Sequence, residues 1–499
     1  MVFSGRGCLL TERSRCWHLG PPGDALWHSD PVTHMHVAGS IHADVLSRAP
    51  GWLDVPTDVN ALLAPLWSRN VGKNVDGVLE VAGLTVTQIA EHVGTPVYVV
   101  DTDDLRARAR EFADAFAGWD VYYAGKSFLC TKVARWVADE GLGVDTCSGG
   151  ELTVALRAGV DPARIGLHGN NKSDAEIELA LDHGIGRIIA DSFDEIGRIT
   201  RLVRDRGRNE RPRLMVRVTT GVEAHTHAYI ATAHEDQKFG FSIHSGQALR
   251  ALRLIHETPE LELIGIHSHI GSQIFDAEGF AVAARRTLRL HAELAGLTGY
   301  EMPEMDLGGG FGIAYTSADH PSTPYELAEA MRRIVEVECA TFGVSVPHLS
   351  IEPGRAISGP SAFALYTVGT VKQVHLDGDS VRTYVAVDGG MSDNIRTALY
   401  AAEYSATLAN RRSAAGPAIA RVVGKHCEGG DILVRDEFLP ADIAPGDLVA
   451  VPASGAYSRS MASNYNHVPR PPVIAVRDGQ IETLLRRETL DDILRLDVE

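Results

Sequence analysis

The sequence predicts a parallel (β/α)8 barrel followed by an all-β domain. From about residue 96, short apolar or β-branched runs alternate with glycine-rich or polar turns and amphipathic helical stretches. Eight such strand–turn–helix units succeed one another at spacings of roughly 20 to 45 residues, which is typical of this barrel. After about residue 362 the runs become strand-like, with Gly, Asp and Pro turns between them. An open doubly wound sheet is the alternative, but its usual GxGxxG motif does not follow the first strand.

The barrel is expected over residues 96–361. It opens with the run PVYVVD at 96–101, which leads into the helical stretch LRARAREFADAFA. Eight further runs follow, and each closes on polar or glycine residues: VYYAGKS (121–127), GVDTCSGG (143–150), RIGLHGNN (164–171), RIIADS (187–192), RLMVRVTTG (213–221), LIGIHSHIGS (263–272), EMDLGGGFG (304–312) and LSIEPGR (349–355).

Three other segments complete the expected organisation. Residues 1–58 are rich in Gly, Pro, His and Trp without a sustained period, so we expect a disordered extension there. Residues 59–95 contain a hairpin-then-helix pattern, GVLEVAGLTVTQIAEHVG, and are expected to join the β domain. That C-terminal β domain is expected over 362–499 and ends in a short helix, TLDDILRLDVE.

Composition limits the possible partners and location. The 499-residue chain has a formal charge of −18, which argues against nucleic acid or an anionic membrane as partner. It has no run of about 18 apolar residues and no secretory signal core, so we expect a cytoplasmic protein without membrane spans. Its six cysteines form no CxxC pair, which indicates thiols in a reducing compartment. We expect no metal site.

One lysine is a candidate for chemistry. The chain has only seven lysines among its 47 basic residues, and Lys126 closes an apolar run beside Tyr122, Tyr123 and Phe128. Arginine cannot form an imine, whereas a desolvated lysine can, because desolvation lowers the pKa of the amine. A strand-end lysine that reaches solvent is the alternative interpretation.

Polar and glycine residues recur at one end of the predicted strands. In a (β/α)8 barrel the active site forms at the C-terminal ends of the strands. A glycine triple there frees backbone N–H groups for an anion, Glu352 could pair with a pyridinium nitrogen, and His269 could stack on a flat ring. The residues expected to meet at this pole are Lys126, Asp145, His168, Asn170, His269, Ser272, Gly308, Gly309, Gly310 and Glu352 to Arg355.

Nine motifs together resemble one enzyme family. They are YAGKS, CSGGEL, LHGNNKS, HSHIGSQ, DLGGGFG, EPGR, DGGMSDNIR, HCEGGD and GAY. In order and spacing, from about residue 60 to the C-terminus, they resemble the diaminopimelate decarboxylases, above all the actinobacterial branch. These are pyridoxal 5′-phosphate (PLP) enzymes of alanine racemase-like fold type III. The resemblance implies conversion of meso-2,6-diaminopimelate to L-lysine and CO₂, the last step of lysine biosynthesis, by a homodimer with shared active sites.

The resemblance also assigns roles to single positions. Lys126 would carry the cofactor covalently, and Cys427, presented from the neighbouring subunit, would be the general acid. The cofactor would be held by Lys126, His269, Ser272, Gly310, Glu352, Pro353, Gly354, Arg355 and Tyr457. The substrate would be bound by Arg355, Arg396, Tyr400, Glu428 and Tyr457.

The expected substrate pocket suits a second amino-acid group. Arginines match a distal carboxylate through paired hydrogen bonds, and Glu428 matches the distal ammonium. Ornithine has no distal carboxylate and would leave buried arginines unpaired, at a cost of about 1–3 kcal/mol or more. Gly429, Ser458 and Arg459 depart from the family pattern near these positions.

Three other functions stay open from the sequence. A decarboxylase of ornithine, arginine or carboxynorspermidine would share the barrel and cofactor, although the paired arginines speak against it. A racemase of the same fold would need a second, opposed base, and the HCEGGD motif is unexpected there. A non-catalytic homologue should have lost Lys126 or Cys427, and both are present.

Overall fold

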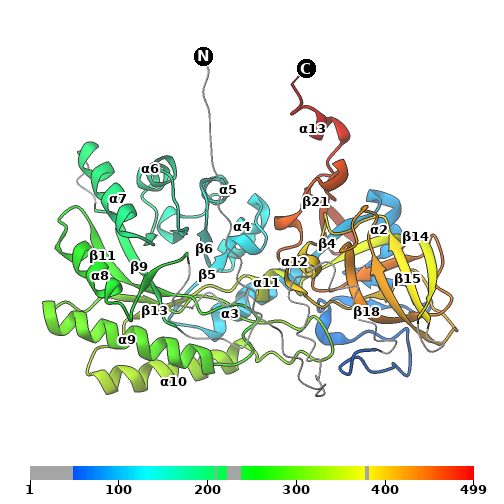
Figure 1. The fold of residues 1–499 in the computed structure, drawn as a ribbon, viewed down its shortest axis with the longest axis horizontal. Coiled ribbons are helices and arrows are strands. Elements are labelled where there is room, and N and C mark those ends of the chain that lie inside the picture. Colours follow the sequence, from blue (N-terminus) through cyan, green and yellow to red (C-terminus); the bar gives the residue numbers. More distant parts are fainter. Residues whose placement is uncertain (1–48, 208–210, 222–237, 377–380, 499) are drawn as a thin grey trace, which may run out of the picture. The chain divides into compact units, whose positions relative to one another are not determined.

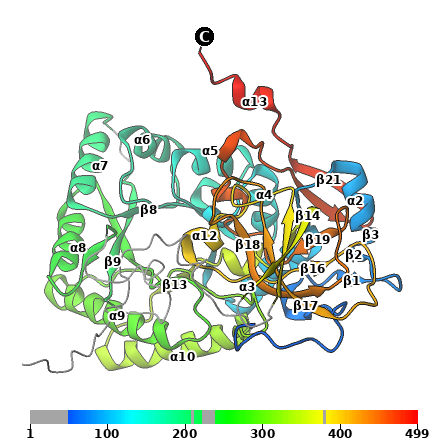
Figure 2. The same cartoon turned by 45° about the vertical axis from the view of Figure 1, so that its right-hand side comes forward.

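The computed structural model describes residues 49–207, 211–221, 238–376 and 381–498. It contains a closed parallel barrel, a nine-stranded sheet and a small three-stranded sheet. Figures 1 and 2 show the barrel strands surrounded by helices α3 to α10 and the second sheet with β14, β15 and β18.

The predicted (β/α)8 barrel is confirmed. Each of the eight runs after residue 120 forms one parallel strand, neighbouring strands pair in chain order, and the β13–β5 pairing closes the ring. The strands are β5 (Asp120–Ala124), β6 (Gly143–Thr146), β7 (Ile165–Leu167), β8 (Arg187–Ala190), β9 (Arg213–Thr219), β11 (Glu262–Ser268), β12 (Glu304–Asp306) and β13 (His348–Ile351). A short strand, β10 (Phe241–Ser242), adds to the end of β9.

Several of the barrel helices begin at side-chain caps that the sequence supplies. Ser148, Ser173, Ser192 and Thr323 each accept a hydrogen bond from the backbone N–H three residues later, which satisfies one free donor of the first turn. Apolar faces of these helices then pack on the strands. The helices are α3 (Thr102–Ala115), α4 (Thr131–Asp139), α5 (Gly149–Arg157), α6 (Asp174–His183), α7 (Phe193–Asp205), α8 (Gln247–Glu257), α9 (Glu278–Thr298) and α10 (Pro324–Phe342).

The second large sheet follows the barrel in sequence. Its strand order is β18-β17-β15-β14-β4-β20-β21, and β19 joins it by pairing with β14 and β16. The long strand β14 (Ala362–His375) begins at the predicted boundary. The others are β15 (Val381–Val387), β16 (Thr407–Leu408), β17 (Pro417–Val423), β18 (Ile432–Pro440), β19 (Leu448–Val451), β20 (Val473–Arg477) and β21 (Gln480–Leu485).

One run lies in a different sheet from the one predicted. The stretch 96–101 was expected to open the barrel, but β4 (Val97–Asp101) pairs antiparallel with β14 and parallel with β20. All five of its residues are buried, with Val97 and Val99 in the core that contains Phe363. The sequence of a strand that is buried on both faces is a continuous apolar run, and such a run does not indicate which sheet the strand joins.

The N-terminal described segment packs with the second sheet. Strands β1 (Val71–Lys73), β2 (Leu79–Val81) and β3 (Leu84–Thr85) form the small sheet, and helix α2 (Val86–Val93) follows. The Leu79 N–H donates to Ala409 O at 2.7 Å, and Leu79 lies in the same core cluster as Phe363. Of the expected extension, residues 1–48 lie outside the described part and residues 49–58 lie within it.

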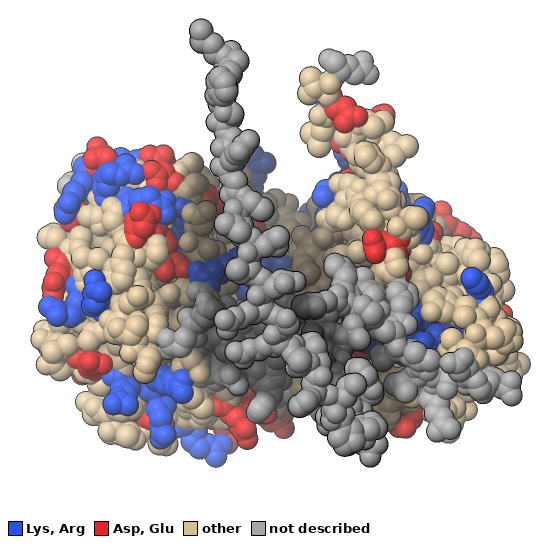
Figure 3. Space-filling model, viewed as in Figure 1, with Lys and Arg blue, Asp and Glu red and all other residues tan. Residues whose placement is uncertain are grey.

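Charged side chains of both signs lie on the surface (Figure 3). Lys and Arg side chains alternate with Asp and Glu side chains over the face drawn in Figure 3. Within the described ranges, no helix combines the length and the apolar character that a membrane crossing requires. The chain closes on the short helix α13 (Leu490–Leu494), where the sequence predicted one.

Candidate active site

A cavity of about 220 Å³ lies where the barrel strands end. Loops that follow the barrel strands supply most of its lining, and residues between 396 and 461 supply the rest. The lining residues are Ala124, Lys126, His269, Gly271, Ser272, Gly310, Phe311, Glu352, Gly354, Arg355, Arg396, Tyr400, Tyr457 and Met461. The cavity thus gathers ten of the thirteen predicted site residues.

Lys126 lies in a one-turn 3-10 helix (Gly125–Ser127) that directly follows β5 and is held by hydrogen bonds of the strand end. The Ala124 N–H donates to Pro353 O at 3.1 Å, and Ser127 Oγ donates to Ala124 O at 2.9 Å. Gly125 and Ser127 on either side are buried, whereas the Lys126 side chain is accessible through the cavity. The turn therefore directs one amine into the cavity.

The charge state of Lys126 differs from the sequence-based prediction. Burial lowers the pKa of its amine, as expected, but the electrostatic interactions with Tyr457, Cys147 and Glu352 raise it more. The net pKa lies above the ordinary value for lysine, so the predicted lowering is wrong. Lys126 is a cation in this arrangement, and an anionic ligand would be drawn to it.

Glu352 is an ionised carboxylate at the base of the cavity. It follows β13, and its Oε1 lies 3.0 Å from His267 Nε2 and 3.2 Å from His168 Nε2. Burial raises its pKa, but the neighbouring histidines lower it more, so that the net pKa lies below the ordinary value. These three residues offer ligand atoms within 4.8 Å of one another, which is also a donor set that could hold a metal ion.

Glycines let the backbone close in around the cavity. Gly310 has a φ of +106°, and a Cβ there would lie 2.4 Å from Gly271 O. A Cβ on Gly354 would lie 2.9 Å from Ala124 Cβ. Next to them, Ser272 Oγ accepts a hydrogen bond of 2.7 Å from Arg355 Nη2, which leaves the Ser272 hydroxyl hydrogen for another acceptor.

Two arginines meet at a buried tyrosine. Arg355 Nη1 donates to Tyr315 Oη at 2.6 Å, and Arg396 Cζ lies 4.9 Å from the centre of the Tyr315 ring. Arg396 Nη1 in turn donates to Tyr404 Oη. Burial raises the pKa of Tyr315, but the two guanidinium groups lower it more, and the net direction is down. Tyr315 thus fixes the spacing of the two predicted substrate-binding arginines.

Sequence reasoning missed Tyr315 and Tyr404. Tyr315 lies five residues after Gly310, in the loop that follows the predicted strand EMDLGGGFG, so its place after a barrel strand was a usable signal. Tyr404 follows the short helix α12 (Arg396–Tyr400), and no local pattern marks it.

Two rings border the cavity. Burial moves the pKa of His269 well below its ordinary value, so its imidazole is neutral and flat at neutral pH. Tyr457 has a φ of 62° and donates its backbone N–H to Ser127 O at 2.8 Å. Its ring centre lies 4.8 Å from Arg355 Cζ. A left-handed backbone at a non-glycine residue is costly and often occurs at functional sites.

Three of the thirteen residues with an expected catalytic or binding role are outside this lining, as are five others expected at the same pole: Asp145, His168, Asn170, Gly308 and Gly309. Pro353 contributes only through its carbonyl, which accepts from Ala124. Cys427 and Glu428 are exposed and lie in the turn between β17 and β18. Just before them, His426 is buried with Nε2 2.8 Å from Ser392 Oγ. The turn therefore has a fixed base and an exposed tip.

Comparisons with known proteins agree on one family. The family model described as "Pyridoxal-dependent decarboxylase, pyridoxal binding domain" matches residues 102–359. The diaminopimelate decarboxylase of Mycobacterium tuberculosis is 52% identical over 442 residues, which cover 87% of this chain and 98% of that relative.

Solved structures give the same result. Diaminopimelate decarboxylase from M. jannaschii, in complex with L-lysine, superposes with a TM-score of 0.80 at 28% identity and covers 87% of this chain and 98% of that one. The Helicobacter pylori enzyme, also with L-lysine, gives 0.75 at 30% identity and covers 82% and 98%. This chain therefore belongs to the diaminopimelate decarboxylase family of pyridoxal-dependent decarboxylases.

Proposed function

We propose that this chain uses PLP to decarboxylate meso-2,6-diaminopimelate to L-lysine and CO₂. The observation that carries the proposal is one cavity that holds Lys126 and the paired guanidinium groups of Arg355 and Arg396. An amine is needed to bind the cofactor, and paired cations at the same cavity suit a substrate with a second carboxylate.

The described residues fit the cofactor. Lys126 supplies the amine, and Glu352 supplies a carboxylate whose pKa is lowered, which suits a protonated ring nitrogen. Gly310 and Gly354 leave a cradle that a Cβ would fill, so backbone N–H groups can approach a phosphate closely. Ser272 and Arg355 add a hydroxyl and a positive charge to the same cradle.

Each side chain then has a physical task. The bound cofactor supplies an electron sink for the electron pair that remains when CO₂ leaves. Glu352 is the counter-charge that keeps a ring nitrogen protonated, and the neutral imidazole of His269 offers a flat face for a ring. Lys126 holds the cofactor at the end of β5.

The far end of the cavity suits a distal carboxylate. Arg396 is buried, and Tyr404 and Tyr315 fix its guanidinium group. Tyr400, on the same short helix, also lines the cavity. A buried, pre-oriented guanidinium binds a carboxylate by two hydrogen bonds and loses little entropy in doing so. We assign Arg355, Arg396 and Tyr400 to substrate binding.

We propose a homodimer in which each subunit completes the other's site. Cys427 and Glu428 lie on the exposed turn between β17 and β18, outside the cavity lining of their own chain. An exposed tip on a fixed base can enter a second subunit. There Cys427 of the partner subunit would donate the proton that replaces CO₂, and its Glu428 would meet the distal ammonium.

Product analysis tests this function. Purified protein with PLP and meso-diaminopimelate should release CO₂ and L-lysine in equal amounts, and removal of the cofactor should abolish both. Release of CO₂ with a different amine product, or conversion of the substrate to a stereoisomer without CO₂, would overturn the proposal.

A Tyr315→Phe variant tests the arginine pair. The change removes the oxygen that accepts from Arg355 Nη1 at 2.6 Å. A hydrogen bond to a charged group contributes about 1.5–3 kcal/mol, so we expect kcat/KM for diaminopimelate to fall about tenfold or more. Most of the loss should be in KM. The matched control is Tyr325→Phe, because Tyr325 is 54% exposed on α10. Unchanged kinetics in Tyr315→Phe would contradict the assigned role.

A further inference from the structure

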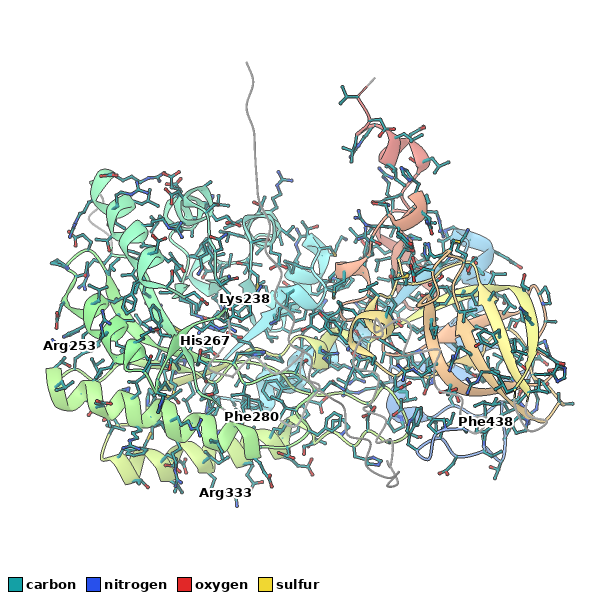
Figure 4. All side chains as sticks on the ribbon, viewed as in Figure 1. Lys238, Arg253, His267, Phe280, Arg333 and Phe438 are labelled. Atoms are coloured by element: carbon teal, nitrogen blue, oxygen red, sulfur yellow. The ribbon has the colours of Figure 1, made fainter. Side chains whose placement is uncertain are left out.

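Four ionisable side chains from four strand ends meet beneath the cavity. Asp145 lies on β6, His168 follows β7, His267 lies on β11, and Glu352 follows β13. His168 Nε2 is 3.2 Å from both Asp145 Oδ1 and Glu352 Oε1, and His267 Nε2 is 3.0 Å from Glu352 Oε1. The two imidazoles lie edge to face, with centroids 5.0 Å apart. Figure 4 shows His267 among the barrel strands.

We propose that His168 and His267 are positioning residues that hold Glu352 as an oriented carboxylate facing the ring nitrogen of bound PLP, and that Asp145 orients His168. The inference rests on the proposed function, because it describes how the same cavity holds its cofactor. It gives a role to His168, His267 and Asp145, which the family motifs and the substrate contacts leave without one.

Burial makes such support necessary. Glu352 is 8% exposed, and the two histidines and Asp145 are each 5% exposed or less. A buried carboxylate is costly unless hydrogen-bond donors or positive charges stabilise it. The two imidazole nitrogens nearest to Glu352 Oε1, at 3.0 and 3.2 Å, are placed to supply that stabilisation, while Glu352 still lines the cavity. Glu352 therefore connects the buried cluster with the bound ligand.

Charged groups of both signs surround the cluster. Asp145 and Asp306 face the guanidinium of Arg187, whose Nη2 lies 2.6 Å from Asp306 Oδ2 and 3.7 Å from Asp145 Oδ1. Burial holds the pKa of His168 well below its ordinary value, so this imidazole is neutral. The positive charge of Arg217 also acts on the Glu352 carboxylate. A protonated ring nitrogen in the cavity would give Glu352 a further partner of opposite charge.

The barrel makes room for the cluster. A Cβ on Gly166, in the middle of β7, would lie 2.4 Å from Asp145 Oδ1. The glycine on β7 thus allows the Asp145 carboxylate to lie across the neighbouring strand, next to His168. Gly166→Ala should displace Asp145 without touching either histidine or Glu352.

The test measures the cofactor rather than turnover. Four variants, His168→Gln, His267→Gln, Gly166→Ala and Glu352→Gln, are compared with wild type for PLP affinity and for the ¹⁵N chemical shift of ring-labelled PLP, without any amino acid present. Residues that orient a metal-binding side chain typically contribute 10- to 100-fold in metal affinity, and by analogy we expect each histidine variant to weaken PLP binding about tenfold or more. The ring-nitrogen signal should move toward the unprotonated position, as in Glu352→Gln. His291→Gln, at a buried histidine on α9, is the control and should leave both readouts unchanged.

Two results would overturn the proposal. The first is that folded His168→Gln and His267→Gln proteins have the PLP affinity and the ¹⁵N shift of wild type. If a histidine variant does not fold, the same two measurements on Gly166→Ala replace it, and wild-type values there would equally overturn the proposal. The other is a stoichiometric metal ion in wild type that is lost from the histidine variants, since the cluster would then be a metal site. Both readouts are independent of the substrate, so a wrong substrate assignment would leave them unaffected.

Discussion

Lys126→Ala should abolish covalent attachment of PLP and lower decarboxylation by about four orders of magnitude or more, the scale at which loss of a covalent catalytic group acts. Lys126 is the lysine that lines the cavity, and Glu352, Ser272 and Gly310 lie around the same space. Lys172, which is buried, already contacts Gly169 O, Ile189 O and Glu195 and is not available for this task.

Borohydride reduction followed by peptide mass analysis checks this prediction. Wild type should gain the mass of the reduced cofactor on the peptide that contains Lys126, and the variant should not. Lys132→Ala is the matched control, because Lys132 lies six residues away on the surface of α4, where it pairs with Glu482. A reducible covalent adduct in Lys126→Ala would contradict the assignment.

Cys427→Ala should lower kcat about 10²- to 10⁴-fold, the usual contribution of a general acid, while PLP binding stays at the wild-type level. Cofactor binding should survive because Cys427 is exposed and lies apart from the cavity lining of its own chain. The measurements are steady-state turnover and cofactor absorbance. Cys339→Ala, which removes a buried thiol from α10, is the control. Full activity of Cys427→Ala would exclude the cysteine as the proton donor.

Mixing the two inactive variants tests whether the site is shared. In a heterodimer of Lys126→Ala and Cys427→Ala, one of the two cavities would have both an intact Lys126 and an intact Cys427 of the partner subunit. Random exchange of subunits should therefore restore about a quarter of wild-type activity. Activity that stays at the sum of the separate variants, after subunit exchange has been shown, would contradict a shared site.

The sequence predicted the barrel because its signal is local and repeated. Each of the eight runs carries its own apolar strand and its own polar end, and each became one strand. The misplaced run at 96–101 shows the limit of this reasoning. The side chains of β4 are buried on both faces, and its pairing with β14 and β20 depends on segments more than 250 residues away. Composition alone cannot distinguish such partners.

In the candidate site, too, local features were predictable from the sequence and contacts between distant segments were not. Lys126, Glu352 and Gly310 were predictable because each lies in a short motif at a strand end. The hydrogen bond from Arg355 to Tyr315 and the contact of His267 with Glu352 were not, because they join residues that lie far apart in the sequence. The sign of the pKa shift of Lys126 was wrong for the same reason. Desolvation follows from the apolar neighbours in sequence, whereas the opposing electrostatic interactions with Tyr457, Cys147 and Glu352 come from elsewhere in the fold.

The rate of CO₂ release from competing amino acids tests the central claim most directly. With PLP-loaded protein, kcat/KM for meso-diaminopimelate should exceed the values for L-ornithine, L-lysine and L-arginine by at least about 100-fold, because substrates without a distal carboxylate leave the buried guanidinium groups unpaired. A kcat/KM for L-ornithine equal to or above that for meso-diaminopimelate would contradict the account.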